Sequence, residues 1–72
     1  MDIRRIDLRI ELGRTHLSVA DARQLRSGSV VSLDRQAGEP VDLYAAGELV
    51  ARGETIVLDN KLGVRVVELV GA

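Results

Sequence analysis

Residues 38–66 of this chain, GEPVDLYAAGELVARGETIVLDNKLGVRV, decide its fold. Apolar residues alternate there with polar ones in short runs, as Val41 and Leu43 do around Asp42. This period of two is typical of a half-buried strand. Glycines at 47 and 53 separate the runs, so no stretch is long enough for a helix. The segment predicts a β-ribbon whose strands break at Gly47 and Gly53.

Two tight turns and one irregularity are predicted within this ribbon and directly after it. The strands on either side of Gly47 pair through a turn at 45–48, and Asp59-Asn60-Lys61 is a second polar turn. The final strand, Val64 to Val70, breaks its alternation at Val66-Val67. Either a β-bulge or burial of both faces by a second chain explains such a break. We favour two-sided burial, because a shared core requires it.

The N-terminal half predicts a strand, a short helix and another strand. The first strand, with one buried face, is predicted from apolar residues that alternate strictly with charged ones, at Ile6, Leu8, Ile10 and Leu12. Ser18 to Asp21 has the S-x-x-D form of a helix start, and Ser27-Gly28 ends that helix. A strand from Val30 to Leu33 follows. Pro40 cannot donate a ladder hydrogen bond, which places it at the start of the next strand.

Size and composition predict one domain, residues 1–72, that needs a partner. A domain of 72 residues buries only ~60% of the surface that its unfolded chain exposes. Yet 46% of the residues are hydrophobic, with one aromatic residue and no cysteine to fill or staple a small core. Two intertwined copies can share a core that neither closes alone. A small monomeric barrel with an ordinary Val/Leu core is the alternative.

The charges and the absence of long apolar runs predict a cytoplasmic protein. Ten Lys and Arg against eleven Asp and Glu exert no bulk attraction on nucleic acid or anionic lipid. No run approaches the ~20 apolar residues of a membrane span, and the N-terminus lacks the layout of a signal peptide. Nucleic-acid binding is an alternative for a small β-barrel. However, Tyr44 is the only ring on which a base can stack, and acidic residues interrupt Arg4, Arg5 and Arg9.

The search for catalytic chemistry indicates no enzyme, no cofactor and no metal site. His16 is the only histidine, so a zinc site with the usual ligand counts is incomplete. For the same reason, no serine has a histidine base within plausible reach other than His16, and no G-x-S-x-G motif surrounds any serine. Two carboxylate pairs, Glu11 with Asp7 and Glu39 with Asp42, are interpreted as solvated strand and turn residues. A chain this small can hardly build the cleft that paired catalytic carboxylates occupy. No phosphate-binding glycine motif occurs.

Three ordered blocks carry a resemblance to a known family. ELGRT at 11–15, GSVVSLD at 28–34 and the ribbon at 38–66 resemble the C-terminal domain of the flagellar motor switch protein FliN. They are equally similar to the SpoA domains of type III secretion sorting platforms, the SctQ/HrcQ group. The resemblance covers Ile6 to Leu69. It implies a small, mostly β, SpoA-like domain with one short helix, forming an intertwined, swapped homodimer.

The resemblance also implies a role and partners. Such domains are non-enzymatic adaptors of the C-ring, in the cytoplasm and peripheral to the inner membrane, at the base of the flagellum or of the injectisome. Their partners would be a second copy or a related SpoA domain, a FliM-like ring protein, and a FliH/SctL-like regulator of the export ATPase. The GEPVDL and GVRV blocks favour the flagellar assignment, and the secretion platform is the alternative. The family's longer N-terminal region and basic tail are not seen, so the chain is either a trimmed piece or a short product.

Residue roles carried over from the family concern docking and the dimer core. The family's glycine, glutamate and valine run matches Gly53 to Leu58, which places partner binding on Thr55, Ile56 and Val57. Thr55 departs from the valine pattern. Ile56 shares a strand face with Leu58, and Thr55 with Val57, so a dimer core that took the Ile56 face would leave docking to the Val57 face. Burial of both faces within the homodimer is the alternative. The predicted dimer core comprises Ile6, Leu8, Ile10, Leu12, Val64, Val66 and Val67.

Overall fold

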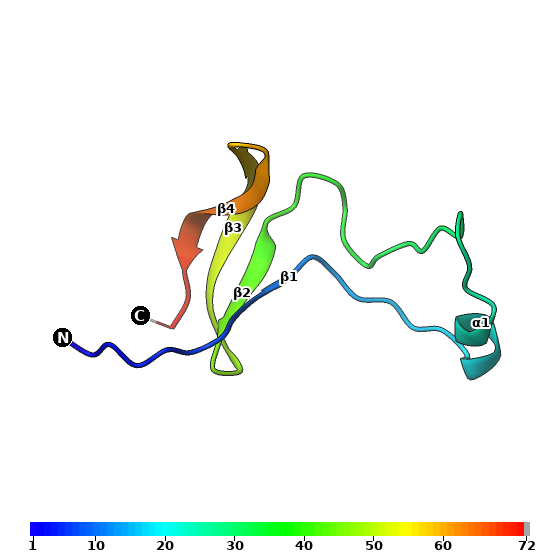
Figure 1. Ribbon diagram of the computed structural model, residues 1–72, viewed down its shortest axis with the longest axis horizontal. Coiled ribbons are helices and arrows are strands. Elements are labelled where there is room, and N and C mark those ends of the chain that lie inside the picture. The colour runs from blue at the N-terminus through cyan, green and yellow to red at the C-terminus, as the bar shows by residue number, and fades with distance from the viewer. Residues whose placement is uncertain (72) are drawn as a thin grey trace.

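A computed structural model describes residues 1–71 and contains one antiparallel sheet and one short helix (Figure 1). The elements follow one another as β1 (Leu8–Glu11), α1 (Val19–Arg23), β2 (Val41–Ala45), β3 (Glu48–Leu58) and β4 (Lys61–Leu69). The strands lie in the sheet in chain order, each antiparallel to the next. The chain is therefore mostly β, with one short helix, as the sequence predicts.

Both predicted turns of the ribbon are confirmed. Ala46 and Gly47 have φ of 50° and 82° between β2 and β3, and Asp59 and Asn60 have φ of 47° and 68° between β3 and β4. Two consecutive residues with positive φ match the twist of the strands that they connect. Asp and Asn tolerate this left-handed conformation, whereas Ala46 depends on the glycine that follows it.

Gly53 does not end a strand, so that prediction is wrong. β3 runs through it, and the register shifts by one residue between Arg52 and Gly53. A side chain at Gly53 would lie 2.6 Å from the carbonyl oxygen of Arg65, so the close approach of β4 requires glycine here. The shift leaves Val67 without a register partner on β3. The broken alternation at Val66-Val67 is thus a β-bulge, whereas we favoured two-sided burial.

Three further predictions need correction. β1 starts at Leu8 rather than at Ile6, because pairing with β2 begins opposite Ala45. The helix begins as predicted, with the Ser18 hydroxyl accepting a hydrogen bond from the amide of Asp21 at 3.0 Å, but it ends at Arg23, before the predicted stop. Residues 30–33 form no strand in the described chain, because no neighbouring segment pairs with them.

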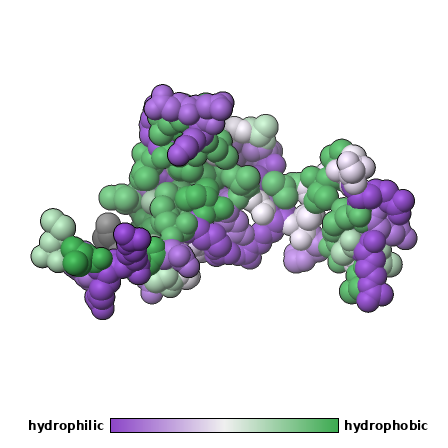
Figure 2. Space-filling model, in the orientation of Figure 1, coloured by the Kyte–Doolittle hydropathy of each residue, from purple (hydrophilic) through white to green (hydrophobic). Residues whose placement is uncertain are grey.

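The two faces of the sheet differ in polarity. Cross-strand partners lie on the same face, so the register defines an apolar face with Leu8, Ile10, Val41, Leu43, Ala51, Thr55, Val57, Leu62, Val64, Val66 and Leu69. The opposite, mainly polar face carries Arg9, Glu11, Asp42, Tyr44, Arg52, Glu54, Arg65 and Glu68, together with the apolar Leu49, Ile56 and Leu58. Among residues 1–71, only Val41, Leu43 and Ala51 form a buried apolar core. Figure 2 shows the hydrophobic residues gathered over the sheet.

Residues 12–40, which we call the arm, extend away from the sheet (Figure 1). α1 contacts none of the four strands, and no residue from 12 to 40 is buried among those described. The radius of gyration is 15.4 Å, whereas a compact domain of this length has about 11 Å. The arm therefore has its apolar side chains exposed in the single chain.

Candidate functional site

The end of the β3–β4 hairpin carries the residues predicted to bind a partner. β2 pairs with β3 only as far as Gly53, so residues 54–65 pair only with one another. Thr55 and Val57 lie on the apolar face, and Ile56 lies on the polar face. The three predicted docking residues are therefore adjacent in the chain but divided between the faces. Val57 is 74% exposed.

A small apolar patch interrupts the polar face at this hairpin. Ile56 is the register partner of Gly63, and Leu58, two residues further along β3, pairs with Lys61. A side chain at Gly63 would lie 3.1 Å from Cδ1 of Leu58 and 3.5 Å from Cγ1 of Ile56, so the glycine leaves room for both to lie against β4. We call Ile56, Leu58 and Gly63 the outer patch. Alternation along the sequence predicts that Ile56 and Leu58 share a face, and the register adds that Gly63 lies opposite Ile56.

An ion pair lies next to the outer patch. Nη1 of Arg65 donates a hydrogen bond to Oε1 of Glu54 across the hairpin at 3.0 Å. Both side chains are exposed, so the pair contributes little to stability. It gives the patch a neutral, polar border, which is the usual arrangement around a small apolar contact surface.

The residues predicted for the dimer core lie mostly on the apolar face. Ile10 and Val64 pack against the buried core, and Leu8 and Val66 lie on the same face but are half exposed. The other three lie outside this pattern: Ile6 and Leu12 flank β1, and Val67 lies at the bulge. Within one chain the apolar face is thus largely uncovered (Figure 2).

Asp42 is a buried charged residue on the polar face of the sheet. We interpreted it as solvated, but it is only 8% exposed. The guanidinium of Arg35 donates to its Oδ2, and Nε of Arg52 lies 3.4 Å from its Oδ1. Arg35 also donates from Nη1 to the carbonyl oxygen of Pro40 at 2.8 Å. The hydrogen bond to Asp42 raises the pKa of Arg35. A residue of the arm is thereby tied to the sheet.

Other charges on the polar face are also paired with neighbours. Arg14 donates to the carboxylate of Glu11, which lowers the pKa of Glu11 and raises that of Arg14. The guanidinium of Arg9 lies 4.6 Å from the ring centroid of Tyr44, a cation–π contact. Since these cations are matched by acids or by the ring, the face presents no continuous basic surface for a phosphate backbone.

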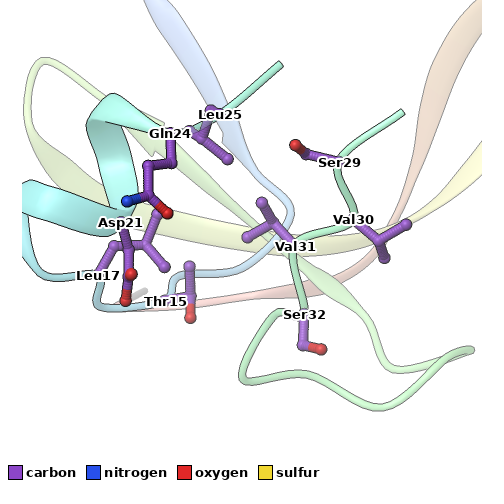
Figure 3. A pocket seen from close by; sticks show the side chains of 9 residues that line it. All are labelled: Thr15, Leu17, Asp21, Gln24, Leu25, Ser29, Val30, Val31 and Ser32. Carbon is purple, nitrogen blue, oxygen red and sulfur yellow. The ribbon is translucent and has the colours of Figure 1, made fainter. Parts of the chain in front are cut away.

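A shallow hollow lies between α1 and residues 29–32 (Figure 3). Leu17, Leu25 and Val31 line it, together with Asp21, Gln24 and small hydroxyl residues. In Figure 3 Val31 points towards the helix, and Val30 points away from it. Val30 is 92% exposed, so the described residues 1–71 cover little of this valine.

Within residues 1–71, no group of three or more His, Cys, Asp or Glu side chains is arranged to hold a metal ion. In the same residues, no helix is long and apolar enough to cross a membrane. His16 is exposed on the arm.

Comparison with known proteins points to one family. A family model described as "Type III flagellar switch regulator (C-ring) FliN C-term" matches residues 3–71. The flagellar motor switch protein FliN of Borreliella burgdorferi is 42% identical over 65 residues, which are 90% of this chain and 58% of that protein. The flagellar motor switch phosphatase FliY of Bacillus subtilis is 42% identical over 64 residues, 89% of this chain but 17% of that protein. The chain spans less than two thirds of these relatives.

Two solved structures share the fold. The crystal structure of the C-terminal domain of HrcQb from Pseudomonas syringae pv. phaseolicola has a TM-score of 0.80 and 25% identity, over 94% of each chain. YscQ-C from Yersinia pseudotuberculosis has a TM-score of 0.74 and 28% identity, over 94% of this chain and 80% of that chain.

Proposed function

Because this chain belongs to the family of the flagellar switch FliN C-terminal domain, we propose that it is a non-enzymatic structural component of the bacterial flagellar motor switch, the C-ring. The observation that carries the proposal is the uncovered apolar face of a sheet whose other face is covered by paired charges. Such a sheet presents an assembly surface. Residues 1–72 act as a single domain of this component.

The apolar face forms the core of an intertwined homodimer. Large exposed apolar areas mark contact surfaces, and here they include both the apolar face and the arm. The dimer core then includes the predicted residues Leu8, Ile10, Val64 and Val66. A related SpoA domain, such as that of a FliM-like ring protein, presents an equivalent surface and is the alternative partner.

The outer patch docks the N-terminal segment of the export-ATPase regulator, which is FliH in flagella. If the homodimer covers the apolar face, Thr55 and Val57 are enclosed with it, because they share that face with Leu43. Ile56 remains outside with Leu58, and this pair carries the docking. This arrangement is the reverse of the one weighed from the sequence, in which the dimer takes the Ile56 face.

The same role in an injectisome is the second candidate. The likeness to HrcQb and YscQ-C favours it, whereas the identity to FliN is higher, at 42%. We do not infer a phosphatase activity from the similarity to FliY, because the match covers only 17% of that protein. We place the domain in the cytoplasm, at the base of either machine, and assign it no cofactor or nucleic acid.

Two matched substitutions test the docking surface. Ile56→Asp should weaken binding of the regulator's N-terminal peptide by about 2 kcal/mol or more, since contact hot spots are few and central. Val57→Asp should instead disrupt the dimer. Calorimetric titration measures the first effect, and light scattering with circular dichroism measures the second.

If Val57→Asp weakens peptide binding and Ile56→Asp disrupts the dimer, docking lies on the face that carries Val57. If Ile56→Asp is folded, dimeric and binds with unchanged affinity, the outer patch has no part in docking. A folded wild-type monomer at micromolar concentration would contradict the homodimer itself.

A further inference from the structure

The outer edge of β4 is open beside the outer patch. β4 is the last strand of the sheet, and within residues 1–71 no strand pairs with its outer edge. The amides and carbonyls on that side are therefore available to an added strand. The bulge at Val67 distorts the second half of this edge, whereas residues 61–65 keep a regular register with β3. The regular part of the open edge is thus the part that borders the outer patch.

Gly63 opens the outer patch towards this edge. Residues of a strand alternate between faces, so Lys61, Gly63 and Arg65 share the face that carries the patch. Because Gly63 has no side chain, no β4 side chain separates Ile56 and Leu58 from a residue across the open edge. Neighbouring strands lie about 4.8 Å apart, so a long apolar side chain opposite Gly63 would reach over the glycine to the patch. Any side chain at position 63 would obstruct this approach.

Two cations flank Gly63 on the same face. Lys61 is exposed, and none of the ion pairs among residues 1–71 includes it. Arg65 donates one hydrogen bond to Glu54, which uses one of the five N–H groups of its guanidinium. An added strand would place one residue opposite each cation, two positions before and two positions after the residue opposite Gly63. Opposite charges stabilise such cross-strand pairs and like charges destabilise them, so both positions favour a carboxylate.

We propose that residues 61–65 of β4 accept an extended segment of the regulator as a fifth strand, with a large apolar side chain opposite Gly63 and carboxylates opposite Lys61 and Arg65. The pattern of the segment is acid–x–apolar–x–acid, which reads the same in parallel and in antiparallel pairing. Backbone hydrogen bonds hold the segment, and the glycine between two cations sets its register. The inference rests on the proposed docking at the outer patch and adds the conformation and the chemistry of the segment that binds there.

Lys61→Glu tests the charge of the edge. In calorimetric titrations with the regulator's N-terminal peptide, this variant should bind about tenfold more weakly than the wild type at low salt, because an attraction becomes a repulsion. The difference should shrink as the salt concentration rises, since the site is exposed. Arg5→Glu is the matched control. It reverses an exposed cation outside the sheet and should bind the peptide as the wild type does.

Gly63→Ala tests the opening towards the patch. The added methyl group would lie 3.1 Å from Cδ1 of Leu58, the end of a flexible side chain, so the hairpin should remain folded. Binding of the same peptide should weaken about tenfold, because the methyl group lies in the path of the apolar side chain. Circular dichroism and light scattering verify the fold and the dimer. Wild-type affinity in a folded Gly63→Ala dimer would overturn the position assigned to the apolar side chain.

Two N-methylated forms of the peptide test the added strand itself. Alternate amides of such a strand point towards β4, and the others point away from it. Methylation of the first set should reduce the affinity about tenfold or more, and methylation of the second set should leave it unchanged. Binding of the unmodified peptide should also slow hydrogen exchange of the amides in residues 61–65. Wild-type affinity for both methylated forms would overturn the added strand.

The outcomes separate this inference from the docking on which it rests. If Ile56→Asp weakens binding but Lys61→Glu does not, the outer patch docks its partner without the acidic pattern. Lys61 would then only protect an open edge against pairing with other chains, as charged residues on edge strands do. A wild-type dimer that binds no regulator peptide would overturn the docking itself, and the inference with it.

Discussion

The sheet and the arm are both rich in aliphatic residues, yet only the sheet buries any of them. Neighbouring strands cover Val41, Leu43 and Ala51. In the arm, by contrast, the exposed fraction is 47% for Leu17, 50% for Leu25 and 92% for Val30. The two regions differ in pairing, because each strand has a hydrogen-bonded neighbour and α1 contacts none of them. Hydrophobic content alone thus does not tell which part of a small chain folds by itself.

The largest expected effect comes from the buried part of the sheet. Leu43→Asp should abolish folding, because an unpaired carboxylate at a site 4% exposed costs several kcal/mol against a total stability of ~5 to 15. Arg9→Asp, on the polar face of β1, is the matched control and should remain folded. Circular dichroism during urea unfolding measures both. Equal loss of structure in the two variants would mean that the two faces are wrongly assigned.

An intermediate effect is expected in the arm and separates the two regions further. Leu25 is 50% exposed in the single chain, where truncation to alanine would cost at most ~0.5 kcal/mol. If a second copy covers it, Leu25→Ala should cost about 2 kcal/mol or more, as at a core position. The unfolding midpoint should then depend on protein concentration. The control variant Arg23→Ala should have the same unfolding midpoint as the wild type. A small effect of Leu25→Ala that does not depend on protein concentration would contradict the burial of the arm by a second copy.

The smallest effect concerns the ion pair at the start of the arm. The hydrogen bond from Arg14 lowers the pKa of Glu11 below its ordinary value of 4.5. The stabilisation is therefore fully present above that value and is lost as the pH falls through the lowered pKa. Glu11→Gln should reduce the melting temperature by a few degrees at pH 7 and make no difference in strong acid. A difference that persists undiminished in strong acid would assign the effect to packing rather than to charge.

Much of the sheet was predictable because its determinants are local. Alternation located β2 and β3, and positive-φ residues located both turns. The bulge at Val67 was visible in the sequence only as a broken alternation. The prediction for Gly53 was wrong because a glycine that ends a strand and a glycine that allows another strand to approach closely look alike in sequence. The expected strand at 30–33 failed for a different reason. Its residues favour a strand, but a strand needs a neighbour, and the single chain provides none.

The candidate site was only partly predictable. The family pattern located the segment of β3 from Gly53 to Leu58, and alternation showed that Ile56 and Val57 face opposite ways. Which of them shares a face with the core depends on the register across four strands. That register shifts by one residue at Val50, between the pairs Leu43–Ala51 and Tyr44–Leu49, and again at the Val67 bulge. The burial of Asp42 likewise depends on Arg35, which reaches it from the returning end of the arm.

By itself, the sequence determined the class of the fold, the turns, the helix start and the family, because period, φ preference and motif spacing act over a few neighbouring residues. The tertiary structure decided which face is apolar, where Ile56 points, and how Gly13 and Asp34 bring the outgoing and returning segments of the arm together. These features depend on segments that lie 20 or more residues apart and meet only after the chain has folded. No local pattern encodes a contact whose two halves are separated in this way.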